Sequence, residues 1–74
     1  METIEEIFAG VFAVNLTEIN DDMSYIDYEP WDSVTHMRII AKIEEEYDIE
    51  FDMDDIIAME TIKKAKKILK KYIE

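Results

Sequence analysis

Hydrophobic residues recur at helical spacing in three parts of the chain, within residues 3–14, 33–47 and 62–73. Each stripe repeats at intervals of three and four residues, which places its members on one face of a helix. The members are Ile4, Ile7, Phe8, Val11 and Phe12 in the first stripe, Val34, Met37, Ile40, Ala41, Ile43 and Tyr47 in the second, and Ile62, Ala65, Ile68, Leu69, Tyr72 and Ile73 in the third. The pattern predicts three amphipathic helices whose apolar faces form the core.

Capping residues mark where these helices begin. Thr3 and Glu6 have the spacing of a capping box, in which each side chain bonds to the backbone of the other residue. Asp32 precedes the second stripe and Thr61 the third, and both residue types accept hydrogen bonds from the first turn of a helix. The second helix is therefore expected to begin near Ser33.

The two segments between the stripes lack this period. Residues 15–31 are rich in Asn and Asp and predict a long loop, pinned to the core by Leu16, Ile19, Met23, Ile26 and Trp31. Residues 48–55 alternate acidic and apolar side chains, but a lone strand would have no partner. We expect a connector and one helical turn at about residues 54–59, with Asp52 or Met53 near its cap and Ile56, Ile57 and Met59 turned inward.

These elements predict an all-α fold, a small four-helix bundle of three longer helices and one short one, in a single domain over residues 1–74. The chain has no Cys, so disulfides and thiolate metal sites are excluded. A chain of 74 residues has little room for a cleft with several convergent catalytic groups, so we do not expect an enzyme. We expect a monomer.

Charge is distributed unevenly along the chain. Residues 1–60 hold 18 acidic and two basic residues, whereas residues 61–74 hold six Lys and one Glu, and the net charge is −11. An acidic body repels nucleic acid and anionic lipid, so basic protein surfaces are the expected partners. No stretch is long and apolar enough to span a membrane, and the first residues lack the basic start of a secretory signal. The sequence favours a cytoplasmic protein.

Two candidate sites fail on their chemistry. A calcium loop starting at Asp48 would have Met53 where Gly is needed and Met59 where Glu is needed, so no metal site is predicted. The only histidine, His36, is three residues from Ser33, but nothing visible would form an oxyanion hole for a hydrolase. We expect His36 to be solvated on the exposed side of its helix, and the five Met residues either to fill the core or to let helices part around an apolar guest.

A serine at the start of a helix is a suitable point for attaching a phosphate. The first turn carries free N–H groups and a partial positive charge, so a phosphodiester on Ser33 would be favoured electrostatically. The run Glu44–Glu46, together with Asp32 and the acidic loop, is expected to form an electronegative rim beside the serine that steers a basic partner.

The run Trp31-Asp32-Ser33-Val34, continued by Met37-Arg38-Ile39-Ile40-Ala41-Lys42-Ile43-Glu44-Glu45-Glu46-Tyr47-Asp48-Ile49, resembles the acyl carrier protein family. The likeness extends from about residue 26 to the C-terminus and more loosely through the first helix. It implies that a magnesium-dependent phosphopantetheinyl transferase attaches 4′-phosphopantetheine from coenzyme A to Ser33. It further implies that Asp32 positions the transferase and its metal. Candidate partner contacts are Val34, Met37 and Ile57, which are apolar, and Glu44 and Glu45, which are charged.

The implied function is a carrier of acyl thioesters for fatty-acid, polyketide or other dedicated biosynthesis. The expected partners are the transferase, an acyl- or aminoacyl-activating ligase, and an acyltransferase or ketosynthase with a basic docking surface. His36, Arg38 and Lys42 depart from the acidic second helix of housekeeping fatty-acid carriers and favour a dedicated carrier. An aminoacyl or peptidyl carrier, or an acidic interaction module without a prosthetic group, would have the same helical pattern.

Overall fold

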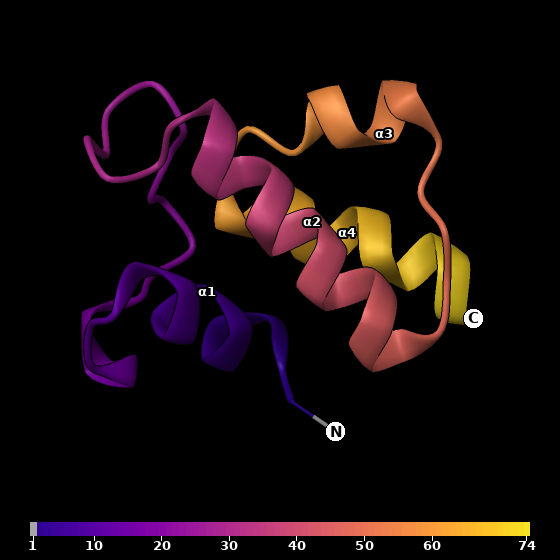
Figure 1. Ribbon diagram of the computed structural model, residues 1–74, viewed down its shortest axis with the longest axis horizontal. Helices are drawn as coiled ribbons and strands as arrows, with labels where there is room; N and C mark the ends of the chain where they lie inside the picture. Colours follow the sequence, from indigo (N-terminus) through magenta and orange to yellow (C-terminus); the bar gives the residue numbers. More distant parts are fainter. Residues whose placement is uncertain (1) are drawn as a thin grey trace.

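A computed structural model describes residues 2–74 of the protein. Within this range the chain forms four α-helices and one short 3-10 helix: α1 (Ile4–Phe12), η1 (Leu16–Glu18), α2 (Ser33–Tyr47), α3 (Met53–Ala58) and α4 (Ile62–Ile73). In Figure 1, α2 crosses the view diagonally, with α1 on one side and α3 on the other. Three long helices and one short one occur as predicted, which confirms the all-α fold class, whereas η1 was not expected.

The predicted caps form at three helix starts. Thr3 and Glu6 form the reciprocal capping box of α1, and Asp32 and Thr61 accept hydrogen bonds from the first turns of α2 and α4. The α1 helix stops two residues before its predicted end because Ala13 adopts a left-handed conformation, with φ of 58°. Asp52 is the N-cap residue of α3.

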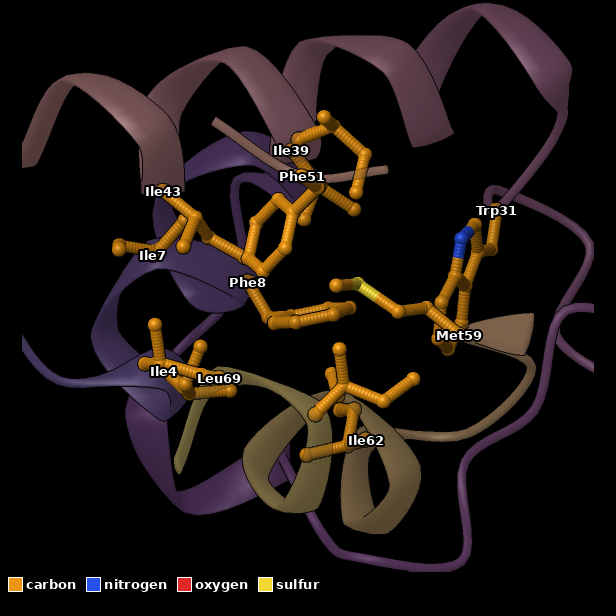
Figure 2. Close-up of a cluster of buried hydrophobic side chains, with 13 residues drawn as sticks. Ile4, Ile7, Phe8, Trp31, Ile39, Ile43, Phe51, Met59, Ile62 and Leu69 are labelled. Carbon is orange, nitrogen blue, oxygen red and sulfur yellow. The ribbon is translucent and has the colours of Figure 1, made fainter. Parts of the chain in front are cut away.

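One hydrophobic core joins all the long helices (Figure 2). Phe8 of α1 packs edge-on against Trp31, with ring centroids 5.0 Å apart. Met59, which follows α3, is also fully buried in this cluster. The other buried apolar members are Ile4, Ile7, Ile39, Ile40, Ile43, Phe51, Ile62, Ala65, Ile68 and Leu69. The core therefore forms from the apolar stripes of α1, α2 and α4, with contributions from the connecting segments.

Several residues expected in the core are exposed instead. In α2 the buried face is formed by His36, Ile39, Ile40 and Ile43, so the overlapping stripe of Val34, Met37 and Ala41 faces outward. The two stripes share helical spacing, and only Ile39, Ile40 and Ile43 belong to the core cluster that includes the buried residues of α1. The remaining exposed residues that we expected inside are Leu16, Ile26, Ile57 and Ile73.

The long loop before α2 is held by backbone hydrogen bonds to the connection between α3 and α4. Ser24 and Thr61 form an isolated antiparallel bridge, and the N–H of Tyr25 donates to the carbonyl of Glu60 at 2.8 Å. The N–H of Ile62 donates in turn to the carbonyl of Met23 at 3.2 Å. These bonds fix the path by which the loop reaches Ser33.

Candidate functional site

Ser33 is the first residue of α2, and its side chain is exposed. The preceding residue, Asp32, has an extended backbone, and its carboxylate accepts a hydrogen bond from the N–H of Thr35 at 2.8 Å. This bond from Thr35 lowers the pKa of the Asp32 carboxyl, which is therefore ionised at neutral pH. An accessible hydroxyl thus lies at the positive end of a 15-residue helix, next to a fixed carboxylate.

His36 is buried beneath this helix start, which contradicts the expectation of a solvated side chain. The indole Nε1–H of Trp31 donates to His36 Nδ1 at 2.9 Å, and His36 Nε2 lies 2.8 Å from the carbonyl oxygen of Ile56. The two rings stack with planes inclined by 22°. Burial costs little here because both ring nitrogens have partners. The spacing of His36 with Ile39, Ile40 and Ile43 was the sequence signal for this position.

An apolar groove lies next to Ser33, between the start of α2 and helix α3. Its volume is about 340 Å³, at the small end of the range for ligand pockets. Its lining residues are Tyr25, Ser33, His36, Met37, Met53, Ile56, Ile57, Met59 and Glu60. The groove therefore offers an apolar surface within reach of a group attached to the Ser33 hydroxyl.

The structure brings together the apolar residues that we expected near the serine. Val34 and Ile57 are each 69 % exposed, and Met37 is 52 % exposed. Met37 and Ile57 line the groove, whereas Val34 lies with Met37 on the outer face of α2. Sequence reasoning missed Tyr25 and Met53, which share the groove, because their place depends on how the loop and α3 pack against α2.

The prediction of an electronegative rim beside the serine is wrong, because the glutamates that we assigned to it lie elsewhere. Glu44 and Glu45 lie at the far end of α2, about 17 Å along the helix axis from Ser33 at 1.5 Å per residue. The Glu44 carboxylate also accepts a hydrogen bond from the N–H of Phe51 at 2.9 Å. This bond holds the segment between α2 and α3 against the end of α2. Glu45 is exposed. Between them and the serine, α2 presents the exposed cations Arg38 and Lys42.

The hydrolase hypothesis has no geometric support. Both nitrogens of His36 bond to Trp31 and Ile56, so neither is available to take a proton from Ser33. Within residues 2–74, no group of three or more Asp, Glu or His side chains is arranged to hold a metal ion. None of the helices in the same range has the length and apolar character needed to cross a membrane.

Comparison with known proteins supplies the family. The family model of the phosphopantetheine attachment site matches residues 2–68, which includes all of α1, α2 and α3 and most of α4. A comparison with curated proteins finds no match. Members of the family are carriers with a covalently attached 4′-phosphopantetheine group and are not catalysts. With a match over more than half of its length, the chain belongs to the phosphopantetheine attachment site family and is a carrier protein.

Proposed function

We propose that Ser33 is the attachment residue for 4′-phosphopantetheine and that the protein presents acyl groups to the enzymes of a dedicated biosynthetic route, for fatty acids, polyketides or other secondary products. The observation that carries this proposal is the exposed Ser33 hydroxyl at the capped start of α2, next to an apolar groove. When bound, the group supplies a terminal thiol on which cargo is held as a thioester.

The residues around Ser33 fit such a group. The N-terminal turn of α2 favours the negative charge of a phosphodiester. The apolar wall formed by Met37, Met53 and Ile57 suits an apolar acyl chain. Covalent tethering raises the local concentration of cargo at each enzyme that docks.

We propose that partner enzymes contact the exposed faces of α2 and α3. Val34, Met37 and Ile57 supply exposed apolar area, and Glu44 and Glu45 supply negative charge at the other end of α2. Apolar anchors with charged neighbours are typical of specific interfaces. The partners are the phosphopantetheinyl transferase, an acyl-activating ligase, and an acyltransferase or ketosynthase with a basic docking surface.

Intact-mass measurement tests the attachment site directly. The purified chain is incubated with coenzyme A, Mg²⁺ and a phosphopantetheinyl transferase of broad specificity, and the product is weighed. We expect one phosphopantetheinyl increment in the wild type and none in Ser33→Ala. Ser24→Ala is the matched control, because Ser24 is the other serine of the chain and bonds to Asp27 within the loop. An increment that survives in Ser33→Ala, or an unmodified wild type beside a modified control carrier, contradicts the proposal.

A further inference from the structure

Two cations lie close to Ser33 on the outer face of α2, in a chain whose net charge is −11. Arg38 and Lys42 are both exposed, and neither forms an ion pair within residues 2–74. At 1.5 Å per residue they lie about 7.5 Å and about 13.5 Å along the helix axis from Ser33. Along this axis they are nearer to the serine than Glu44 and Glu45 are.

Helix α2 itself supplies no carboxylate partner for these cations. The positions three and four residues away from Arg38, where a helical ion pair would form, hold no Asp or Glu. One of those positions is Lys42, so two like charges lie one turn apart. Four residues after Lys42, the carboxylate of Glu46 accepts a hydrogen bond from the N–H of Glu2 at 2.8 Å instead. The repulsion between the two cations is therefore not offset by an ion pair on their own helix.

Helix α1 and the residue before it approach the two cations across a groove. The groove has a volume of about 370 Å³, and Glu2 and Glu6 line it together with Arg38 and Lys42. The Glu6 carboxylate accepts a hydrogen bond from the N–H of Thr3 at 2.8 Å, as part of the capping box of α1. In the part of the chain that the structure describes, no ion pair crosses this groove.

Exposed apolar side chains lie beside the cations and reach the serine. We call the five residues of this surface the cationic face of α2: Val34, Met37, Arg38, Ala41 and Lys42. All five are exposed, and the first four share one shallow concavity of about 590 Å³ with Ser33. An enzyme that transfers a group to the Ser33 hydroxyl must bring its reacting atoms within bonding distance of that oxygen. Such an enzyme therefore covers the concavity.

We propose that the phosphopantetheinyl transferase that acts on this chain docks on the cationic face, with carboxylate side chains opposite Arg38 and Lys42. This inference rests on the proposed function of Ser33. Carboxylates of the transferase supply the ion pairs that the chain itself does not form, and complementary charges of this kind raise the rate of association.

The same two cations disfavour a different class of partner. A transferase with a basic docking surface meets like charges at Arg38 and Lys42, and this repulsion selects against it. Basic groups of a partner are favoured only at the far end of α2, near Glu44 and Glu45. The charges along α2 therefore specify acidic groups close to the serine and basic groups beyond them.

Modification rates of charge-reversed chains test the proposal. Intact mass over time gives the rate at which the full chain, mixed with coenzyme A and Mg²⁺, gains the phosphopantetheinyl group. Two sources of transferase are compared: an extract of the cells that make this protein, and a purified transferase of broad specificity whose docking surface is basic. The test variant combines Arg38→Glu with Lys42→Glu. The matched control combines Lys63→Glu with Lys67→Glu, because these exposed lysines of α4 form no ion pair within residues 2–74 and give the same change of net charge.

We expect the extract to modify the test variant at least about tenfold more slowly than the wild type at about 0.05 M NaCl. This difference should shrink at about 0.5 M NaCl, because salt screens exposed charges. The basic transferase should modify the test variant faster than the wild type. The control should stay within about twofold of the wild type with both sources. The proposal is overturned if both sources change in the same direction, if the extract modifies the test variant as fast as the wild type, or if the control is slowed equally.

The experiment separates this inference from the attachment site on which it rests. A wild type that neither source modifies contradicts the attachment of the group to Ser33. A wild type that only the purified transferase modifies overturns the docking proposal alone, as does a rate that is insensitive to the cationic face. If circular dichroism shows that the test variant does not fold, Arg38→Gln combined with Lys42→Gln decides in its place, with smaller changes of the same signs.

Discussion

At the residue scale, Asp32 has a structural contact and a proposed functional one that substitution can separate. Asn is as good an N-cap residue as Asp, whereas Ala cannot accept the hydrogen bond from Thr35. Asp32→Asn should therefore keep the melting temperature of the wild type, and Asp32→Ala should lower it.

If the carboxylate also positions the transferase and its metal, Asp32→Asn should be modified about 10–100-fold more slowly than the wild type, the effect expected for one lost charge-assisted contact. The rate is measured by intact mass over time, and the fold is checked by thermal melting. Equal modification rates for Asp32→Asn and the wild type would restrict Asp32 to capping.

A second pair of residues distinguishes the core from the proposed docking surface. Ile39 is fully buried, whereas Ile57 is 69 % exposed beside the groove. Ile39→Ala should lower the free energy of unfolding by about 2–5 kcal/mol, because it leaves a cavity. Ile57→Ala should change it by less than about 0.5 kcal/mol, yet slow the reactions in which partners take part. Urea unfolding measures the first effect. A large loss of stability in Ile57→Ala would show that this side chain supports the fold.

The geometry of the candidate site could be predicted in part from single residues. Ser33 and Asp32 were visible because a motif and a cap occupy consecutive positions before an apolar stripe. The burial of His36 was not predicted, since its partner carbonyl belongs to Ile56, 20 residues further along the chain. Local periodicity carries no information about a contact of that range. The same limit applies to Ile57, whose outward direction depends on how α3 packs.

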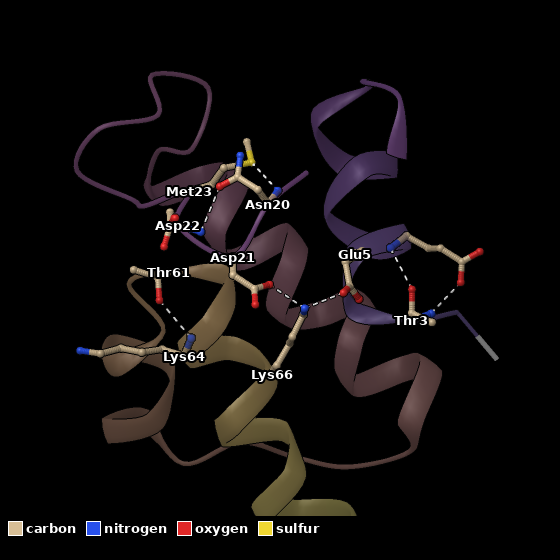
Figure 3. A network of polar contacts seen from close by, with 10 residues as sticks. Thr3, Glu5, Asn20, Asp21, Asp22, Met23, Thr61, Lys64 and Lys66 are labelled. Carbon is tan, nitrogen blue, oxygen red and sulfur yellow. Dashed lines mark hydrogen bonds and ion pairs between the residues drawn. The ribbon is translucent and has the colours of Figure 1, made fainter. Parts of the chain in front are cut away.

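At the scale of elements, Lys66 joins three parts of the chain (Figure 3). Its ammonium group lies 2.6 Å from Glu5 of α1 and 2.6 Å from Asp21 of the long loop. The bond with Lys66 lowers the pKa of Glu5, and the bonds with Asp21 and then Glu5 raise the pKa of Lys66. The sequence showed six lysines near the end of the chain but not that one of them holds α1, the loop and α4 together.

The pKa shifts give this network a defined pH window. Because the pKa of the Glu5 carboxyl is lowered, this group stabilises the fold at pH values above its ordinary pKa of 4.5. The stabilisation is lost as the pH falls through the pKa that Glu5 has in the folded state. Because the pKa of the Lys66 ammonium group is raised, this group stabilises the fold at pH values below its ordinary pKa of 10.5. The stabilisation is lost as the pH rises through the pKa that Lys66 has in the folded state. The network should therefore contribute most between about pH 5 and pH 10.

Lys66→Met should accordingly lower the stability at pH 7 by about 1 kcal/mol for each pair at most, and by less at pH 3 or pH 11.5. Lys63→Met is the control, because Lys63 is exposed and forms no ion pair within residues 2–74. Chemical unfolding of both variants at the three pH values measures the difference. A loss that is equal for the two variants at pH 7 contradicts this interpretation.

Helix boundaries show which elements the sequence could specify. The starts of α1, α2 and α4 were predicted because Thr3, Asp32 and Thr61 are recognisable caps. The end of α1 was not, because Ala13 takes a left-handed conformation that usually favours Gly. The 3-10 helix η1 was also missed, since three residues are too few to show a period.

At the scale of the whole molecule, charge opposes the compact state. The chain carries 19 acidic and eight basic residues, and its radius of gyration is 11.1 Å. At about 0.01 M salt the Debye length is about 30 Å, so charges across the whole molecule repel one another. At about 0.3 M salt it falls to well under about 10 Å, and only near neighbours interact. The favourable ion pairs are mostly exposed and contribute little, so screening removes more repulsion than attraction.

Raising the NaCl concentration from about 0.01 M to about 0.3 M should therefore raise the melting temperature, by about 4–8 °C for each 1 kcal/mol of repulsion removed. The rise should be larger in Lys63→Gln, which increases the excess of negative charge, and smaller in Glu45→Gln, which reduces it. Both side chains are exposed, so neither substitution disturbs packing. Thermal melting followed by circular dichroism at constant pH measures all three proteins. A fall with salt would mean that the ion pairs of α4 outweigh the repulsion.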